Sequence, residues 1–462
     1  MKIKDFIFLF LLVVPLTQAL GQSYSLEIQL KNQPGNFIVL GKMSGDNFYP
    51  TDTLLLYRNK NSALTDTKKA EYSFQENTQP GVYRLVLGKT TYARVMGEPP
   101  QQLDFIFNKE NIIFETDFEA PLKELLVVLS EENRVWFGFL RKEKEIQARL
   151  NELELEIEYF RKKDNADDAE KMKNAIAEFN ALQQQRDAFI NEITERNPEL
   201  FATKLIKMYH EPFLDGHLTK EERREKFQKE YFNLLDFSDE SLMNSSVYTD
   251  KVFQYLTSYN RPRYTKELLE KEYIKAVDVV LPNVNGNQKV YEFILDYLVH
   301  GFEVLKMENV LNYIAENYSG TTCQTDEKTT LERKLEAQKM KVGTTVPDFT
   351  LTDPEGFFID FADIQSEKIL LLFWASWCPH CNEMVPHIKN WAAGQNDLEI
   401  VAVSLDSSKE EWQNAIKELE IKTWTNLSDL QKWDGKVATD YNVYATPTLF
   451  LIDEERKILA KP

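Results

Sequence analysis

The spacing of apolar residues changes along the chain and first predicts strands. From residue 23 to about residue 117, short apolar runs alternate with polar positions, and turn signals such as Gln33-Pro34-Gly35 and Gln79-Pro80-Gly81 separate them. Such runs are typical of paired strands bounded by turns. Their spacing predicts an antiparallel β domain, a sandwich or half-barrel, over residues 22–118.

Helical spacing takes over afterwards and predicts an all-α region over residues 119–325. Apolar residues recur at every third and fourth position, while Gly and Pro become rare. A second long helix is expected over residues 167–196, forming a hairpin with the helix before it. The first helix would bury one apolar stripe: Leu150, Leu153, Ile157 and Phe160. A dimerising coiled coil is the alternative, but the stripe is too short and irregular for heptads.

A polar linker over residues 326–341 leads to a mixed pattern over residues 342–462. The order there is strand, strand, helix, strand, helix, strand, strand. Two continuous apolar runs, within residues 368–376 and 398–406, are typical of strands covered on both faces. The predicted fold class is therefore an α/β C-terminal domain preceded by an antiparallel β domain and an all-α region.

The first residues have the pattern of a secretory signal peptide over residues 1–21. Lys2 and Lys4 precede an apolar run at residues 6–14. We expect cleavage before Gln22 and export to the periplasm or cell envelope. An uncleaved anchor helix is the second choice, because the run is shorter than the ~20 residues that span a bilayer. After cleavage we expect no membrane-spanning segment.

Composition excludes one class of partner. The chain has 462 residues, enough for about three domains of ordinary size. Apolar residues make up 43%, which allows real hydrophobic cores. The formal net charge of −19 would be repelled by phosphate backbones, so we expect no nucleic-acid partner.

Two of the three cysteines, Cys378 and Cys381, lie where an apolar strand gives way to a helix. A helix N-terminus carries unpaired N–H groups and a partial positive charge, which stabilise a thiolate, the nucleophilic form of cysteine. Cysteines three residues apart are about one helical turn apart and close enough to form a disulfide. The spacing indicates a redox pair, in which an exposed Cys378 attacks and a more buried Cys381 resolves the mixed disulfide.

Two other uses of the pair are weaker. A structural zinc site needs four ligands, usually two such pairs, and His380 and His387 complete no familiar spacing, so no metal is expected. A permanent structural disulfide stays open on the spacing alone. The third cysteine, Cys323, lies in a polar stretch, and we expect it to be incidental; a disulfide between Cys323 and Cys378 has no support.

A second signal, Ala445-Thr446-Pro447-Thr448, stands before a predicted strand. Together with the Trp-Cys-Pro-His-Cys motif, it resembles the thioredoxin superfamily, and residues 342–462 resemble its TlpA/ResA branch of exported thiol–disulfide oxidoreductases. The resemblance implies a cis Thr446–Pro447 bond facing the cysteine pair, with backbone free to pair with an extended substrate. It also implies substrate contacts from five residues: Trp377, Pro379, His380, Thr446 and Pro447.

Some positions depart from the family pattern. The buried acid that many thioredoxins carry six residues before the first cysteine is Leu372 here, and the Glu that the TlpA/ResA branch often carries three residues after the second is Met384. Glu383, about 100° away from Met384 around a helix, is the candidate proton acceptor. A peroxidatic cysteine is expected three residues after Thr or Ser; Ala375 occupies that place, which sets a peroxiredoxin aside.

His380 leaves the direction of electron flow open. A histidine between the cysteines resembles the dipeptide of the periplasmic disulfide-forming oxidase, and an imidazole beside the thiolate makes the disulfide more oxidising. The other branch features favour a reductant. We expect no cofactor other than the redox-active Cys378–Cys381 disulfide.

The resemblance also implies partners. Protein thiols and disulfides would be the clients, a membrane reductase would supply electrons, and cytochrome maturation or rescue of oxidised proteins would be the roles. The order of the upstream segments resembles a group of Bacteroidetes envelope proteins whose N-terminal domains have no established activity. The alternative function is an envelope ligand- or partner-binding protein with the thioredoxin-like fold as scaffold, although a scaffold has no need of the cysteine pair.

The C-terminal pattern lacks the helix that normally covers one face of this fold after the last hairpin. A bare face would expose roughly several hundred Å2 of apolar surface, which monomers rarely do. We therefore expect the helical region, a partner chain or a further segment to cover that face. Leu449 and Leu451 should not both be exposed.

Overall fold

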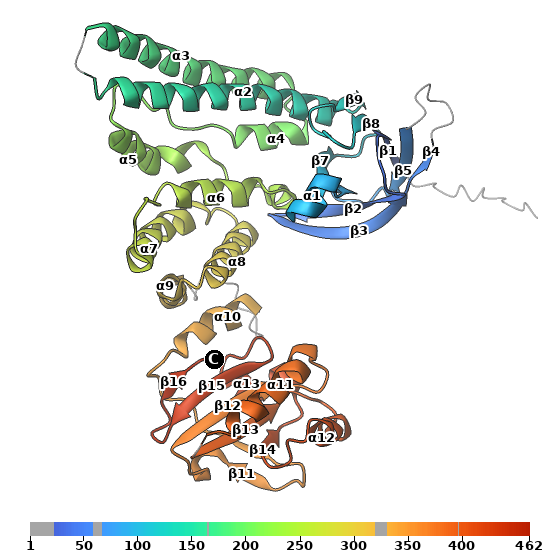
Figure 1. Ribbon diagram of the computed structural model, residues 1–462, viewed down its shortest axis with the longest axis vertical. Helices are drawn as coiled ribbons and strands as arrows, with labels where there is room; N and C mark the ends of the chain where they lie inside the picture. The colour runs from blue at the N-terminus through green and yellow to red at the C-terminus, as the bar shows by residue number, and fades with distance from the viewer. Residues whose placement is uncertain (1–22, 59–66, 164–165, 319–329, 396) are drawn as a thin grey trace, which may run out of the picture. The chain divides into compact units, whose positions relative to one another are not determined.

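The computed structural model describes residues 23–58, 67–163, 166–318, 330–395 and 397–462 (Figure 1). The chain divides into two compact units, Met1–Ser258 and Tyr259–Pro462. The expected signal peptide and Cys323 lie outside the described residues. In the part that is described, none of the helices combines the length and the apolar character that crossing a membrane requires.

The first unit begins with a β-sandwich. Its two sheets have the orders β4-β5-β1-β8-β9 and β3-β2-β6-β7. The strands are β1 (Tyr24–Lys31), β2 (Phe37–Ser44), β3 (Asn47–Leu55), β4 (Tyr57–Arg58), β5 (Thr67–Phe74), β6 (Gly81–Gly88), β7 (Gln101–Phe107), β8 (Ile112–Asp117) and β9 (Leu126–Leu129), with a short helix α1 (Thr91–Met96) before β7. Alternate residues of β1 are fully buried, as the strand period of two dictates. The β domain is confirmed, with one parallel pair, β1 with β8, that the pattern did not indicate.

Strand β9 corrects the expected start of the helical region at residue 119. Residues Leu126–Leu129 pair with β8, and the first long helix begins only at Glu131. Adjacent β-branched valines favour a strand there. Ser130 then caps the helix, because its side chain accepts a hydrogen bond from the Asn133 N–H at 3.0 Å.

A helical hairpin follows in the first unit. Helices α2 (Glu131–Phe160) and α3 (Ala166–Arg196) lie side by side (Figure 1). Leu150, Leu153 and Ile157 of α2 pack with Ile176 and Phe179 of α3, so three residues of the expected stripe face the partner helix of the same hairpin. The fourth, Phe160, is half-buried and is not part of this cluster. The remaining helical elements are α4 (Phe201–Lys207), α5 (Lys220–Glu230), η1 (Tyr231–Leu234), η2 (Glu240–Asn244) and α6 (Val247–Thr257).

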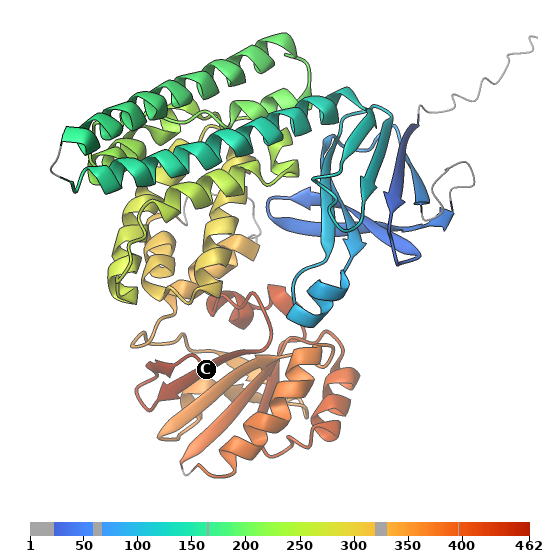
Figure 2. The same ribbon diagram turned by 45° about the horizontal axis from the view of Figure 1, so that its top comes forward.

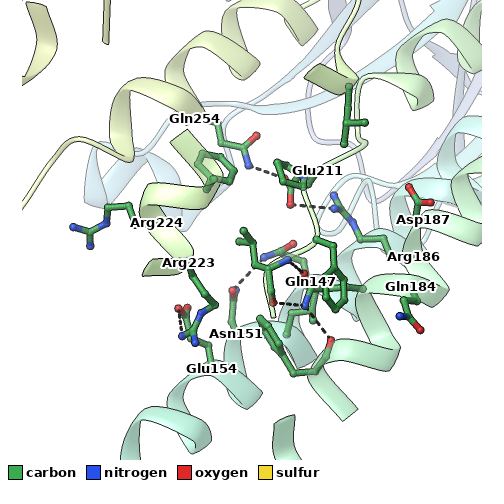
Figure 3. Close-up of a pocket in the computed structure, with 18 of the residues that line it drawn as sticks. Gln147, Asn151, Glu154, Gln184, Arg186, Asp187, Glu211, Arg223, Arg224 and Gln254 are labelled. Carbon is green, nitrogen blue, oxygen red and sulfur yellow. Dashed lines mark hydrogen bonds and ion pairs between the residues drawn. The ribbon is translucent and has the colours of Figure 1, made fainter. Parts of the chain in front are cut away.

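A cavity of about 830 Å3 lies between this hairpin and α5 (Figure 3). Arg186 lines this cavity and forms ion pairs with two carboxylates. Its Nη2 lies 2.6 Å from Glu143 Oε1, and its Nη1 lies 3.0 Å from Glu211 Oε2. Gln254 donates a further hydrogen bond to Glu211 at 2.7 Å. The buried Glu143 and Arg186 thus form a polar network with the half-buried Glu211 and Gln254.

The second unit starts with four helices: α7 (Lys266–Asn283), α8 (Gln288–Val304), α9 (Glu308–Tyr318) and α10 (Thr330–Lys339). The buried Glu270 carboxylate of α7 accepts hydrogen bonds from the backbone N–H and the side chain of Asn309, at the start of α9. This contact ties α7 to α9. The boundary after Ser258 therefore falls within the region predicted as one helical domain, 119–325.

The rest of the second unit is a thioredoxin-like α/β domain, as predicted (Figure 2). Its sheet has the order β11-β10-β14-β13-β12-β15-β16. Central β12 pairs in parallel with β13 and antiparallel with β15, and all but the first of its residues are buried. The elements are β10 (Thr350–Thr352), β11 (Phe358–Asp360), η3 (Phe361–Asp363), β12 (Lys368–Trp374), α11 (Pro379–Ala392), β13 (Leu398–Ser404), α12 (Lys409–Glu418), β14 (Thr425–Ser428), η4 (Lys432–Asp434), α13 (Lys436–Asp440), β15 (Thr448–Asp453) and β16 (Ile458–Ala460).

The apolar side chains of β15, which we expected another segment to cover, are not fully exposed to solvent. Leu449 is buried and Leu451 is half-buried against the core of this domain. Beyond β16, the Lys461 amine donates a hydrogen bond to the Ala337 carbonyl of α10 at 3.1 Å. The contact comes from residues 326–341, which were expected to be a polar linker; the structure corrects this expectation, because Thr330–Lys339 form helix α10.

Candidate active site

The cysteine pair stands at the first turn of α11. Cys378 is the N-cap residue, and its Sγ accepts a hydrogen bond from the Cys381 N–H at 3.2 Å. Pro379 occupies the first helical position, where a missing N–H costs nothing. The sulfur therefore lies at the positive end of a helix of 14 residues, where a negative charge is stabilised.

The two thiols differ less in exposure than the sequence predicted. Both are free thiols, Cys381 is fully buried, and Cys378 is only 5% exposed. The expectation of an exposed Cys378 is wrong because the loop before β15 lies against it. The Cys378 thiol donates a hydrogen bond to the Thr446 carbonyl at 3.4 Å.

The pairing of β12 with β15 brings the Thr446–Pro447 segment to this place. Phe373 of β12 is in register with Thr448 of β15, so the residues beyond both positions meet at one end of the sheet. The Thr446–Pro447 bond is cis, as the motif predicted, and both residues are half-buried. Two segments far apart in sequence thus form one site.

The other residues expected to contact substrate lie around the sulfur. Trp377 is 47% exposed, and its ring meets that of Trp433 edge to face with centroids 6.2 Å apart. Pro379 and His380 are exposed in the first turn of α11. Their roles in substrate contact stay predictions.

Glu383 is not brought to the buried cysteine. It follows Cys381 by two residues, which places it about 200° away around the helix. Glu383 is exposed whereas Cys381 is fully buried. Its role as proton acceptor stays a prediction that this geometry does not favour.

Burial holds the Cys381 thiol in its protonated form. The pKa of Cys381 is raised to about 12, chiefly by burial and next by the hydrogen bond with the Cys378 side chain, against smaller opposing effects of the Ala375 backbone and the Thr446 side chain. At neutral pH, Cys381 is therefore a neutral thiol. It becomes a nucleophile only when its proton leaves.

Alkaline pH should destabilise the reduced second unit through Cys381. The pKa of this thiol rises from an ordinary 9.0 to about 12 on folding. The folded state then binds the proton more tightly, so stability is unaffected below the unfolded pKa and falls as the pH rises above it, by up to about 1.4 kcal/mol per pH unit. Melting curves of reduced wild type and Cys381→Ala, from about pH 7 to about pH 10, test this. Parallel loss of stability in both proteins would contradict it.

Sequence analysis missed one buried carboxylate beside the pair. Asp406 is fully buried and accepts hydrogen bonds from the Ser376 N–H at 3.1 Å, the Ser376 hydroxyl at 2.6 Å and the Ser404 hydroxyl at 2.7 Å. Trp374 of β12 is in register with Ser404 of β13, so the residues two positions beyond each strand end face one another. Asp406 thereby fixes the loop that ends at Cys378. An acid directly after a buried strand was the available signal.

Loss of the Asp406 carboxylate should destabilise the second unit. We expect Asp406→Ala to lower the free energy of unfolding by about 2–3 kcal/mol, because three donors lose a charged acceptor. Asp406→Asn should cost less, and Asp363→Ala, at an exposed position, should have little effect. Denaturation followed by tryptophan fluorescence measures this, since every tryptophan except Trp136 lies in the second unit. An Asp406→Ala variant as stable as Asp363→Ala would refute the assignment.

Metal ligands are a separate question. Among the described residues, no group of three or more His, Cys, Asp or Glu side chains is arranged to hold a metal ion. The chemistry that the site offers on its own residues is that of a dithiol.

Comparison with known proteins places the C-terminal domain. A family model described as "AhpC/TSA family" matches residues 342–461. "Thiol-disulfide oxidoreductase ResA" of a Bacillus cereus strain is 29% identical over 126 residues, 27% of this chain and 70% of the relative. The protein of the same name from Bacillus subtilis (strain 168) is 30% identical over 124 residues, 26% of this chain and 67% of the relative.

One solved structure is similar over about the same fraction of the chain. The solution structure of a thiol:disulfide interchange protein from Bacteroides sp. is 31% identical and covers 26% of this chain and 80% of its own, with a TM-score of 0.24. The sequence relationship to ResA extends over two thirds of that protein's length at 30% identity. On that relationship, the chain belongs to the TlpA/ResA-like thiol–disulfide oxidoreductases of the thioredoxin superfamily.

Proposed function

We propose that this protein exchanges disulfides with client proteins in the periplasm or cell envelope, and that it acts as a reductant. The observation that carries the proposal is the position of the Cys378 sulfur. It accepts the Cys381 N–H at the start of α11 and lies 3.4 Å from the Thr446 carbonyl beside the cis proline. A nucleophile, its resolving partner and a backbone edge for an extended client thus meet at one point.

The reaction would proceed in two exchanges. The Cys378 thiolate attacks one sulfur of a client disulfide; a bond forms between Cys378 and the client, the client disulfide breaks, and the released client thiolate takes a proton. The Cys381 thiol then gives up its proton and attacks Cys378 Sγ. The Cys378–Cys381 disulfide forms and the second client thiolate leaves and is protonated, so the client gains the two electrons that the chain loses.

Client contact would use the residues around the sulfur. An extended client segment would pair with the backbone at Thr446 and lie against the exposed Trp377 ring, with Pro379 and His380 at the other side. Backbone pairing accepts many sequences, so such a site suits clients that share a disulfide rather than a motif. The signal-peptide pattern and the exported branch of the family support a location in the envelope.

Turnover needs a source of electrons, which we propose to be a membrane reductase that reduces the Cys378–Cys381 disulfide by the same exchange chemistry. That disulfide would be the only redox group required. The binding-scaffold function remains the competing proposal, and it predicts no dependence on the cysteines.

Reduction of insulin by dithiothreitol, with the protein as catalyst, tests the function. Wild type should accelerate the reaction, and a Cys378→Ser/Cys381→Ser double variant should not. Equal rates for the two proteins would reject the oxidoreductase function and leave the binding-scaffold function. Equilibration with glutathione buffers tests the direction. A reduction potential below that of protein disulfide isomerase, about −180 mV, supports a reductant, and a higher value overturns that direction.

A further inference from the structure

Helices upstream of the thioredoxin-like domain contact both loops that border the attacking cysteine. Within the second unit, α8 and α10 supply three charged side chains to these contacts: Glu303, Arg333 and Lys334. The first loop contains Trp433, whose ring meets Trp377, and the second contains Tyr444, two residues before Thr446. Both loops are linked to Cys378: Trp433 packs on Trp377, the residue before Cys378, and Thr446 accepts the hydrogen bond of the Cys378 thiol.

Arg333 holds the first loop. Its Nη1 donates a hydrogen bond to the Trp433 carbonyl at 2.8 Å, and its Nη2 lies 3.7 Å from the Asp434 carboxylate. The Arg333 side chain is only 16% exposed, so it lies between α10 and this loop rather than in solvent. Hydrogen bonds from a charged donor are roughly twice as strong as neutral ones. Arg333 thus restrains the backbone of the residue that packs on Trp377.

Glu303 and Lys334 hold the second loop. The Tyr444 hydroxyl donates a hydrogen bond to the Glu303 carboxylate at 3.4 Å, and Lys334 Nζ lies 3.5 Å from the same carboxylate. Lys334 also lies over the Tyr444 ring, 5.9 Å from its centroid. Burial and, to a smaller extent, the Glu303 carboxylate together raise the pKa of Tyr444 to about 12, so the hydroxyl remains a donor at neutral pH.

We propose that Arg333, Glu303 and Lys334 are positioning residues for the redox site, and that α8 and α10 are a working part of it. They keep the Trp433 and Tyr444 loops in the arrangement that receives a client. Ordering a loop before binding removes an entropic cost from the encounter. The expected change in client binding rests on the proposed function, whereas the expected change in the exposure of Cys378 does not.

Loss of these contacts should make Cys378 react faster with a small reagent but bind clients more weakly. This combination distinguishes a positioning role from a general loss of structure. Releasing the Tyr444 loop should uncover Cys378, now 5% exposed and bonded to Thr446, so a small alkylating reagent should react faster. Releasing either loop should weaken client binding, so KM should rise while kcat changes little. General loss of structure would lower client reduction without a KM-selective effect.

The test compares Arg333→Ala and Glu303→Gln with Lys339→Ala in the full-length reduced protein. Lys339 lies on the same helix but pairs with Glu336, away from both loops. In Glu303→Gln we expect iodoacetamide to alkylate Cys378, located by mass spectrometry, at least about threefold faster. In both test variants we expect the KM for insulin to rise about fivefold, equivalent to roughly 1 kcal/mol of client binding. Lys339→Ala should match wild type in both.

Each outcome decides the proposal. An alkylation rate within about twofold of wild type in folded Glu303→Gln, or a KM within about twofold of wild type in both folded variants, would overturn it. If Arg333→Ala does not fold, Arg333→Lys replaces it, since a lysine retains a charged donor and should show the same changes in smaller size. If wild type fails to reduce insulin, the proposed function falls, and the alkylation rates alone still confirm or overturn the positioning role.

Discussion

Replacing Cys378 with serine should reduce client turnover by at least about a thousandfold, equivalent to ~4 kcal/mol in the activation barrier. A serine hydroxyl keeps its proton at neutral pH, so the helix terminus has no anion to stabilise and the first exchange has no nucleophile. Cys378 also makes the hydrogen bonds to Cys381 and Thr446 that define the site. Insulin reduction rates at fixed dithiothreitol measure the effect.

Cys381→Ser is the matched control, because it removes the other thiol of the same turn. The first exchange should still occur, but the mixed disulfide cannot be resolved, so a covalent adduct between Cys378 and the client should accumulate. Non-reducing gels and mass spectrometry would detect it. An adduct on Cys378→Ser instead, or on neither variant, would contradict the assignment of attacking and resolving roles.

Replacing Arg186 with leucine should lower the free energy of unfolding of the first unit by about 3–5 kcal/mol, because it leaves buried carboxylates unpaired. The Arg186 side chain is 7% exposed and binds Glu143 and Glu211. Although burial by itself would raise the pKa of Glu211, the charges of Arg186 and Lys251 lower it, so this carboxylate is ionised in the folded protein. Without Arg186, the Glu143 carboxylate loses the guanidinium that lies 2.6 Å away, and Glu211 keeps only the charge of Lys251 and the hydrogen bond from Gln254.

Arg149→Leu provides the comparison for this substitution. Arg149 also joins α2 to α3, with Nε 2.8 Å from Glu178 Oε1, but both side chains are exposed. Exposed ion pairs contribute little, so we expect Arg149→Leu to change stability far less than Arg186→Leu. Hydrogen exchange of α2 and α3, followed by mass spectrometry, would localise the loss. Similar exchange in both variants would show that burial of the pair does not matter.

Local patterns predicted the parts of the fold that depend on neighbours in sequence. The apolar run of β12, the capping position of Cys378 and the stripe on α2 each follow from periodicity within a few turns or residues. The cis Thr446–Pro447 bond was implied by the resemblance to the thioredoxin superfamily rather than by periodicity. The periodic features needed no knowledge of tertiary packing.

Tertiary packing decided the features that were missed. Asp406 meets Ser376 only because β12 and β13 pair in one register, across 30 residues of chain. Cys378 is covered by a carbonyl 68 residues away. Strand β9 exists because β8 offers it an edge, and the boundary after Ser258 depends on which of several similar helices pack together. Composition carries no record of such pairings.

If the chain acts on clients as proposed, the low exposure of Cys378 would decide when in a client's life the reaction occurs. With the residue 5% exposed and the Thr446 carbonyl beside its sulfur, only an extended, unfolded stretch of polypeptide would bring a disulfide into line for attack. Bridges locked inside finished folds would be ignored, while those in newly exported or misfolded chains would be cut. The shape of the entrance would therefore spare mature neighbours without any need to recognise them.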